Sequence, residues 1–282
     1  MTPSEPIRPA FTLFRLGLLG AGALLILPLT AAEKGSPQTS TKLYTQTGTD
    51  PSFKELVGEN KAALTQGAKG SKIAVNLAVV EELPEARRPI AKDINLHTLP
   101  DSSIPRKDFP KWTRWYQEDG HTQIFRLFPD EVNLHSARPL AARVEAFSKT
   151  QWTEAQGNWH EWSGVVTPIN PVGMSLQVKN SVNDWAMNIT IRENGDVLLD
   201  HRRAEDVVIA HGMLRKSFLL RVRDNGLDYE VYLNGHKAGE GRYKRPEGKT
   251  CFRWGMYVGE HEVRREAMIL FSGVTIDGHE AK

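Results

Sequence analysis

The sequence predicts an all-β protein, built as an antiparallel β-sandwich or β-jelly roll with an irregular N-terminal extension. From Trp112 onwards, short runs rich in β-branched and aromatic residues follow one another, with turn signals between them. Two of these turns contain Asn-Gly, in ENGD at 193–196 and in LNGH at 233–236, and this dipeptide is the strongest short-range signal of a β-hairpin. Because no helical pattern separates the runs, we expect antiparallel sheets.

The N-terminal part divides into two predicted segments. Residues 1–32 read as a signal peptide, because Arg8 and Arg15 precede the short apolar run LGLLGAGALLIL, which is followed by a proline and small residues. The run is short for a membrane span, which needs roughly 20 residues, and a retained anchor is the alternative. Residues 33–110 are expected to be a linker and an N-terminal extension, with a helical pattern at 52–68, a strand-like run at 72–80 and many prolines from Pro84 to Pro110.

Charge and cysteine usage narrow the class of protein. The formal net charge is +2, and removal of residues 1–32, which carry Arg8, Arg15 and Glu5, leaves +2 − 1 = +1. A net charge close to zero argues against nucleic-acid binding. Cys251 is the only cysteine, so no internal disulfide can form, and its place inside a strand indicates a packed side chain. We therefore expect a secreted or periplasmic bacterial protein, a monomer that is free of the membrane after signal cleavage.

The third predicted segment, residues 111–282, holds the strands of the sandwich. In chain order these are expected at TQIFRLF (122–128), ARVEAF (142–147), WHEWSGVVT (159–167), SLQVKN (175–180), WAMNITI (185–191), DVLLDHR (196–202), SFLLRVR (217–223), DYEVYLNG (228–235), FRWGMYVG (252–259) and MILFSGVTI (268–276). Successive side chains of a strand point to opposite faces, so each run can be sorted into an apolar and a polar face.

Three of these strands present two large polar side chains on one face, two residues apart or, across a glycine, four residues apart, opposite an apolar face. They are Arg143 with Glu145, Gln177 with Lys179, and Arg253 with Tyr257 on either side of Gly255. A solvated sheet face is the ordinary explanation for any single strand. The alternative is one polar surface built from all three strands, and the donor side chains of arginine, glutamine, lysine and tyrosine suit an acidic sugar.

In order and spacing the three strands resemble the signature strands of the alginate-lyase-type polysaccharide lyases. That family carries an R-x-E-L strand, a Q-I/V-H strand and a Y-F-K-x-G-x-Y strand on one sheet of a β-jelly roll, a fold shared by glucuronan lyases and heparin lyases. ARVEAF is similar to the first strand, LQVKN to part of the second and CFRWGMY to the third. The hairpin DYEVYLNGHKAGEG resembles the sheet edge of concanavalin-like sandwiches. The resemblance lies in three short blocks within residues 112–278.

The resemblance implies a polysaccharide lyase that cleaves a uronic-acid-containing polymer by β-elimination. Arg143 and Gln177 would hold the uronate carboxylate, where negative charge develops, and Tyr257 would be the acid/base phenol. Arg253 and Glu145 are further expected contacts of the substrate site, with Glu145 also a salt-bridge partner of Arg143. Trp159 and Trp162 lie on opposite faces of their run, so one of them, Trp159, is a candidate stacking platform for a sugar.

The sequence departs from the family pattern at Lys179, which stands where the family has histidine. The base could then be Lys179 itself, Tyr257 acting in both steps, or a histidine from elsewhere. His160, between two tryptophans, is the first choice, with His135, His201 and His236 as alternatives. Loss of the histidine is also compatible with a non-catalytic carbohydrate-binding module or with an interaction domain of laminin-G type.

No cofactor and no metal ligand set are predicted. The sequence has no E-x-D-x-x-E arrangement of a sandwich-fold glycoside hydrolase, no second histidine to make HEW a zinc site, and no phosphate-binding or dinucleotide fingerprint. A structural calcium ion is compatible with the fold class, although no acidic loop identifies a site for it.

Overall fold

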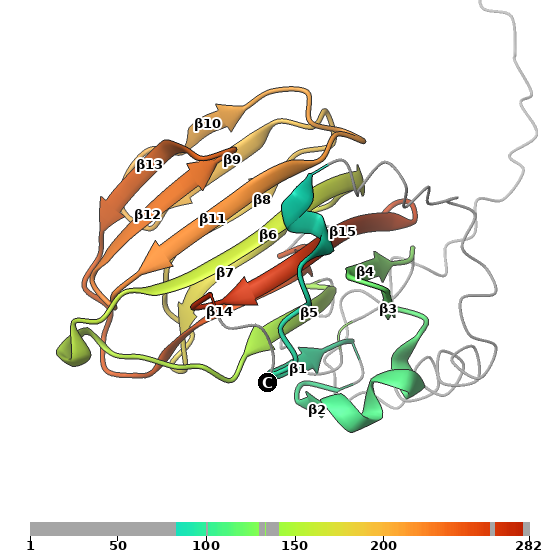
Figure 1. Ribbon diagram of the computed structural model, residues 1–282, viewed down its shortest axis with the longest axis horizontal. Coiled ribbons are helices and arrows are strands. Elements are labelled where there is room, and N and C mark those ends of the chain that lie inside the picture. The colour runs from blue at the N-terminus through green and yellow to red at the C-terminus, as the bar shows by residue number, and fades with distance from the viewer. Residues whose placement is uncertain (1–82, 100, 130–132, 134–140, 260–262, 279–282) are drawn as a thin grey trace, which may run out of the picture. The chain divides into compact units, whose positions relative to one another are not determined.

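The computed structural model describes residues 83–99, 101–129, 133, 141–259 and 263–278. Within these residues two antiparallel sheets face each other, which confirms the predicted β-sandwich (Figure 1). No helix among them is long and apolar enough to cross a membrane. The predicted signal peptide, the helical pattern at 52–68, the strand-like run at 72–80 and His135 lie outside the described residues.

The first sheet has eight strands. In spatial order these are β10 (Val207–Ala210), β9 (Val197–His201), β8 (Trp185–Ile191), β7 (Met174–Asn180), β14 (Thr250–Tyr257), β5 (Arg143–Ser148), β1 (Ile94–His97) and β2 (Ile104–Pro105). The second sheet has seven strands: β13 (His236–Arg242), β12 (Asp228–Leu233), β11 (Phe218–Asp224), β6 (His160–Asn170), β15 (Ala267–Ile276), β4 (Thr122–Leu127) and β3 (Tyr116–Asp119). Short 3-10 helices occur at η2 (Pro84–Arg87), η3 (Arg106–Trp112) and η4 (Glu154–Gln156).

Each run expected to be a strand from residue 122 onwards forms one, and both Asn-Gly turns join neighbouring antiparallel strands. In the second turn Asn234 and Gly235 have φ values of 50° and 82°, the left-handed pair that a tight hairpin requires. The sandwich also begins earlier than residue 111, because β1 and β2 of the proline-rich segment extend the first sheet beyond β5. These strands are short and bounded by prolines, so they carry little periodic signal.

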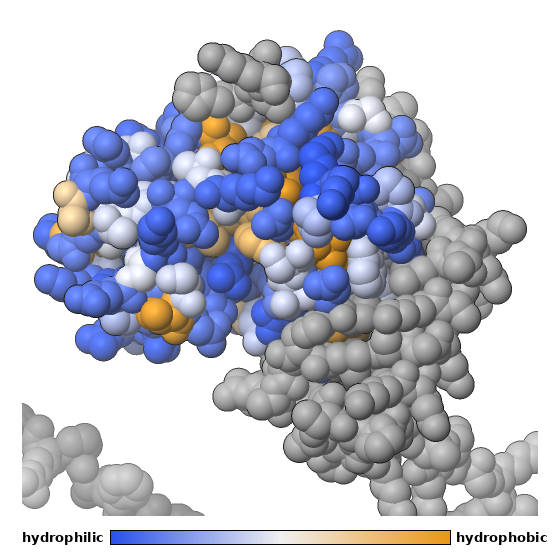
Figure 2. All heavy atoms as spheres, turned by 90° about the horizontal axis from the view of Figure 1, so that it is seen from below, coloured by the Kyte–Doolittle hydropathy of each residue, from blue (hydrophilic) through white to orange (hydrophobic). Residues whose placement is uncertain are grey.

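Aromatic side chains fill the space between the sheets. Trp162 of β6 and Trp254 of β14 face each other with ring centroids 6.1 Å apart, and Phe271 packs edge-on against both Trp162 and Phe125. Trp162 and Trp254 are almost completely buried, and burying such large apolar surfaces is the main driving force of folding. On the surface seen in Figure 2, hydrophilic residues dominate and apolar ones appear as separate spots.

A buried chain of hydrogen bonds also ties the two sheets together. The Trp254 indole donates to the Gln123 amide oxygen over 2.8 Å, and the Gln123 amide nitrogen donates to the Tyr116 hydroxyl over 2.9 Å. Tyr116 in turn donates to Glu118 over 2.6 Å. Burial raises the pKa of the Tyr116 hydroxyl well above its ordinary value, so this hydroxyl stays a donor. The hydrogen bond between Trp254 and Gln123 therefore holds β14 against the second sheet.

Gly255, in the middle of β14, has a backbone that only glycine adopts easily. Its φ is +136°, and a Cβ placed there would lie 2.2 Å from the Val144 carbonyl oxygen and 2.9 Å from the Phe125 ring. The register with β7 shifts between Trp254 and Tyr257, as expected where a strand carries a bulge. A larger residue at this position would therefore collide with its neighbour strand and with the core.

We predict that Gly255→Ala destabilises the fold by about 3 kcal/mol or more, because backbone strain and overpacking add together. Gly120→Ala is the matched control, since Gly120 also has a positive φ of +56° but has nothing within 4 Å of its Cβ position. The control should cost only about 1–2 kcal/mol. Urea denaturation of the two variants measures the difference, and equal losses would contradict the predicted collision.

Candidate active site

The three polar strands identified in the sequence are direct neighbours in the first sheet. β14 lies between β5 and β7, with Tyr257 opposite Arg143 on β5 and Arg253 opposite Gln177 on β7. Residues directly opposite each other share a face of the sheet, and Trp254 and Met256 between them point into the core. The polar side chains therefore share the face turned away from the core, called here the open face.

Glu145 connects the two outer strands of this group. Its carboxylate accepts a hydrogen bond of 2.9 Å from the Gln177 amide and lies 3.9 Å from the Arg143 guanidinium. β5 and β7 are not neighbours, so the bond to Gln177 spans β14. Glu145 is paired with Gly255 on that strand. Glu145 and Gln177 are both 3% exposed, so the bond forms in a weakly solvated environment.

Two cations reach the ring of Tyr257. The Arg143 Cζ lies 4.3 Å from the ring centroid and the Lys179 Nζ lies 5.8 Å from it. Lys179 is paired with Cys251 near the start of β14, whereas Tyr257 ends that strand, so these long side chains converge over the middle of β14. A cation at such distances is attracted by the electrons of the ring.

The surroundings of Lys179 lower the pKa of its amine. Burial lowers the pKa of Lys179 to about 8, with Arg253 and Arg143 lowering it further and Glu145 opposing the shift. The side chain is 6% exposed, and desolvation disfavours a charged ammonium. A substantial fraction of Lys179 is therefore neutral at mildly alkaline pH, which an ordinary surface lysine is not. Burial also raises the pKa of the neighbouring Cys251 thiol, as expected for a packed cysteine.

Several buried polar atoms on the open face lack a hydrogen-bond partner among the described residues. They include Nε of Arg143, Nε of Arg253 and Oδ1 of Asn188 on β8. Buried polar groups are nearly always paired in folded proteins. The unpaired donors of Arg143, beside Tyr257, and of Arg253, opposite Gln177, therefore point to an acceptor group that binds on this face, such as a carboxylate.

The structure does not bring His160 or Trp159 to this surface. His160 belongs to β6 of the second sheet, where its Nδ1 lies 2.8 Å from Asp277 and its ring stacks on Trp152 at 4.6 Å. Trp159 precedes β6 and is 39% exposed, with the Arg223 guanidinium 4.8 Å from its ring. Both residues lie away from the open face because that face belongs to the first sheet, whereas His160 is in β6 of the second sheet and Trp159 directly precedes β6.

The alternative histidines lie elsewhere as well. His201 Nδ1 lies 2.6 Å from the Tyr229 hydroxyl of the second sheet, and His236 is exposed where β12 turns into β13. Within the described residues, His97 of β1 is paired with Glu145 and therefore shares the open face. The alternation in INLH at 94–97, with Ile94 and Leu96 buried, is the sequence pattern that could have predicted this strand. The surrounding prolines made the pattern too short to recognise.

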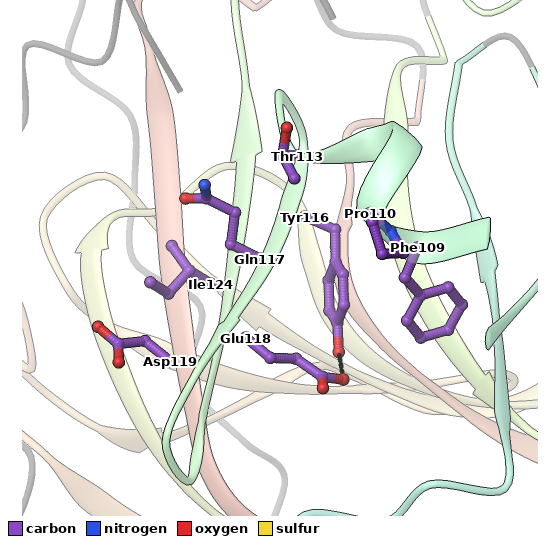
Figure 3. Close-up of a pocket in the computed structure, with 8 residues that line it drawn as sticks. All are labelled: Phe109, Pro110, Thr113, Tyr116, Gln117, Glu118, Asp119 and Ile124. Atoms are coloured by element: carbon purple, nitrogen blue, oxygen red, sulfur yellow. Dashed lines mark hydrogen bonds between the residues drawn. The ribbon is translucent and has the colours of Figure 1, made fainter. Parts of the chain in front are cut away.

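A cavity of about 420 Å³ lies at the edge of the second sheet. Its lining comes from η3, β3 and β4: Phe109, Pro110, Thr113, Tyr116, Gln117, Glu118, Asp119 and Ile124 (Figure 3). The Tyr116 hydroxyl points toward Glu118, which is also held by Arg106. No residue of β5, β7 or β14 lines this cavity, so it is separate from the open face of the first sheet.

The described residues contain no group of three or more histidine, cysteine, aspartate or glutamate side chains placed to hold a metal ion. The open face instead holds cations, and within the described part of the chain the carboxylate that pairs with one of them, Arg143, is that of Glu145. What the arrangement offers chemically is a set of fixed donors, one amine of lowered pKa and one phenol.

The sandwich, with donors gathered on one sheet, has the fold of the β-jelly-roll polysaccharide lyases. Among solved structures, the family 7 alginate lyase AlgAT5 superposes with a TM-score of 0.52 at 15% identity, covering 66% of this chain and 94% of the lyase. Alginate lyase PA1167 from Pseudomonas aeruginosa gives 0.52 at 15% identity over 66% of this chain and 97% of its own. The alginate lyase from Corynebacterium sp. gives 0.52 at 13% identity over 66% and 93%.

At this identity the likeness shows a shared fold. It confirms the predicted jelly-roll architecture and the structural resemblance to the alginate-lyase-type polysaccharide lyases. No family model and no curated protein match the sequence.

We predict that Glu145→Gln lowers the pKa of Lys179 further below about 8, because the carboxylate is the group that stabilises the ammonium. Titration of the lysine side chains by NMR measures the shift. Lys237 is the internal control, since its bonds to Glu240 and Glu230 raise its pKa and it should stay charged throughout. Glu161→Gln on the second sheet is the matched variant, and a Lys179 pKa that moves equally in both would refute the assignment.

Proposed function

We propose that this protein is a polysaccharide lyase that cleaves a uronic-acid-containing polysaccharide by β-elimination. The observation that carries the proposal is the convergence of Arg143, Lys179 and Tyr257 on the open face of a sheet whose fold is that of alginate lyases. A fold alone does not define an activity, so the activity depends on what these side chains can do.

The first requirement of the reaction is charge neutralisation. Removing the proton at C5 of a uronate places negative charge on its carboxylate, and donors fixed in advance stabilise that charge most effectively. Arg143 and Arg253 each have a buried Nε–H without a partner among the described residues. Gln177 uses one N–H on Glu145 and keeps a second one for the substrate.

The second requirement is a base and an acid. In the proposed reaction the neutral Lys179 amine takes the proton from C5, and the electron pair of that bond forms the C4–C5 double bond. The bond from C4 to the glycosidic oxygen breaks, and the Tyr257 hydroxyl gives its proton to the departing oxygen. Lys179 suits the first role because its pKa is lowered to about 8. No cofactor is needed, since these side chains supply neutralisation, base and acid.

The cellular setting is part of the proposal. The apolar run at 16–27 behind Arg8 and Arg15 supports export through a signal peptide, and polysaccharides are encountered outside the cell. We propose a monomer that meets its polymer in the periplasm or the medium. Alginate and glucuronan are the first polymers to test, because both are built of uronate residues.

Tyr257→Phe should lower kcat by at least 10²-fold, because a general acid typically contributes about 10²–10⁴-fold. The assay follows the ultraviolet absorbance of the unsaturated product. Tyr232→Phe is the matched control: Tyr232 also lies under an arginine, with Arg221 4.1 Å from its ring, but on the second sheet. Full activity of Tyr257→Phe would show that the acid has been misassigned. If the wild-type protein binds a polymer but forms no product from any, a carbohydrate-binding module is favoured. If it binds none of the polymers, an interaction domain is favoured.

The pH profile tests the base. Because Lys179 must be neutral to accept a proton, kcat/KM should rise with pH and level off above about 8. Lys179→His should move the midpoint of this rise down toward the imidazole range of ~6.5, and Lys179→Met should remove it together with most of the activity. A midpoint that stays in place in Lys179→His would exclude Lys179 as the base.

A further inference from the structure

The open face carries a row of side chains that runs across the strands beyond the proposed catalytic group. Arg253 on β14 is opposite Gln177 on β7, Gln177 is opposite Asn188 on β8, and Asn188 is opposite Asp200 on β9. Arg253 and Asp200 are thus separated by three strand spacings, roughly 14 Å. This span exceeds one sugar ring, so a polysaccharide lying along the row would place different residues over its two ends.

The end of the row over β8 and β9 presents two acceptor groups, the Asn188 amide oxygen and the Asp200 carboxylate. Asn188 is only 4% exposed, and its Oδ1 has no partner among the described residues. Asp200 is half-buried and accepts a hydrogen bond from the Thr190 hydroxyl on the same face. Asp206 adds negative charge near Asp200, and Arg192 partly offsets it. An unpaired, buried amide oxygen between two polar neighbours indicates that a donor from a ligand completes this site.

The two ends of the row therefore have opposite preferences. Over β14 and β5, the unpaired atoms are the N–H donors of Arg143 and Arg253, which suit a carboxylate. Over β8 and β9, the unpaired amide oxygen and the Asp200 carboxylate suit hydroxyl groups. A second carboxylate at this end would meet Asp200 in a partly desolvated environment, where repulsion between like charges is stronger than in water.

We infer that the open face over β8 and β9 is a subsite for an uncharged sugar, with Asn188 and Asp200 as its specificity-determining residues. The substrate would then carry a neutral sugar beside the uronate that is cleaved, in contrast to a polymer made of uronates alone. This inference rests on the proposed function for the position of the uronate. The inference goes beyond that function because such a subsite would distinguish acidic polysaccharides by the sugar that neighbours the uronate.

The ionisation of Asp200 supports the same view. Burial raises the pKa of Asp200 to about 6, with Asp206 raising it further while the Thr190 hydrogen bond and Arg192 oppose the shift. Above this pH the carboxylate repels a neighbouring uronate, and below it the protonated group does not. Uronate carboxylates remain ionised in that range, so discrimination against an all-uronate chain should weaken as the pH falls through about 6.

The test measures binding, so that it does not depend on turnover. Isothermal titration calorimetry would compare oligosaccharides of unsulfated chondroitin, in which glucuronate alternates with a neutral amino sugar, with all-uronate oligosaccharides of alginate and glucuronan. The host protein is the Tyr257→Phe variant, with and without Asp200→Asn. Asp119→Asn, which removes an exposed carboxylate from β3 of the second sheet, is the matched control.

We expect the host to bind the alternating oligosaccharide more tightly than either all-uronate one. Asp200→Asn should raise the affinity for the all-uronate chains about fivefold, the effect of one nearby charge, and 1 M salt should shrink this gain. Asp119→Asn should leave the affinities unchanged. Equal or tighter binding of the all-uronate chains by the host, or no change on Asp200→Asn, would overturn the subsite. Such a result is distinct from failure of the proposed function, which would appear as no unsaturated product from any polymer with the wild-type protein.

Discussion

The Glu145 carboxylate is the constraint on which the open face of the first sheet depends. It accepts the hydrogen bond from Gln177 across β14, lies beside Arg143 and raises the pKa of Lys179 against the effect of burial. Without a buried anion, two arginines and a lysine on adjacent strands would repel one another in a weakly solvated place. With it, the cations can stay close together and keep donors available for a substrate.

β14 joins this polar surface to the hydrophobic core. Its inward side chains, Trp254 and Met256, are buried between the sheets, and the Trp254 indole is held by Gln123. Its outward side chains, Arg253 and Tyr257, belong to the open face. Gly255 between them is required by its backbone and by the closeness of β5 and of the Phe125 ring. The residues of β14 that point inward therefore pack the core, and those that point outward contribute to the polar open face.

A lysine in place of histidine at Lys179 is consistent with the proposed chemistry because the environment changes what a lysine does. In water its ammonium would hold its proton far above neutral pH. Burial and two neighbouring arginines bring the pKa to about 8, which provides a base in the range where many enzymes operate. The side chain alone does not supply this property, and the same residue on an exposed strand would be an ordinary surface cation.

The sequence by itself determined the sandwich, its later strands, the Asn-Gly hairpins and the two faces of β14, because these depend on residues that are neighbours in the chain. It also singled out the polar side chains of β5, β7 and β14 by their period of two. Only the tertiary structure decided that these strands adjoin, that His97 of the N-terminal segment joins their face and that His160 does not. The lowered pKa of Lys179 and the row of side chains leading to Asp200 likewise depend on which strands are neighbours in the folded protein. Strand order and burial are set by contacts between segments that are distant in the sequence, so a local sequence pattern does not predict them.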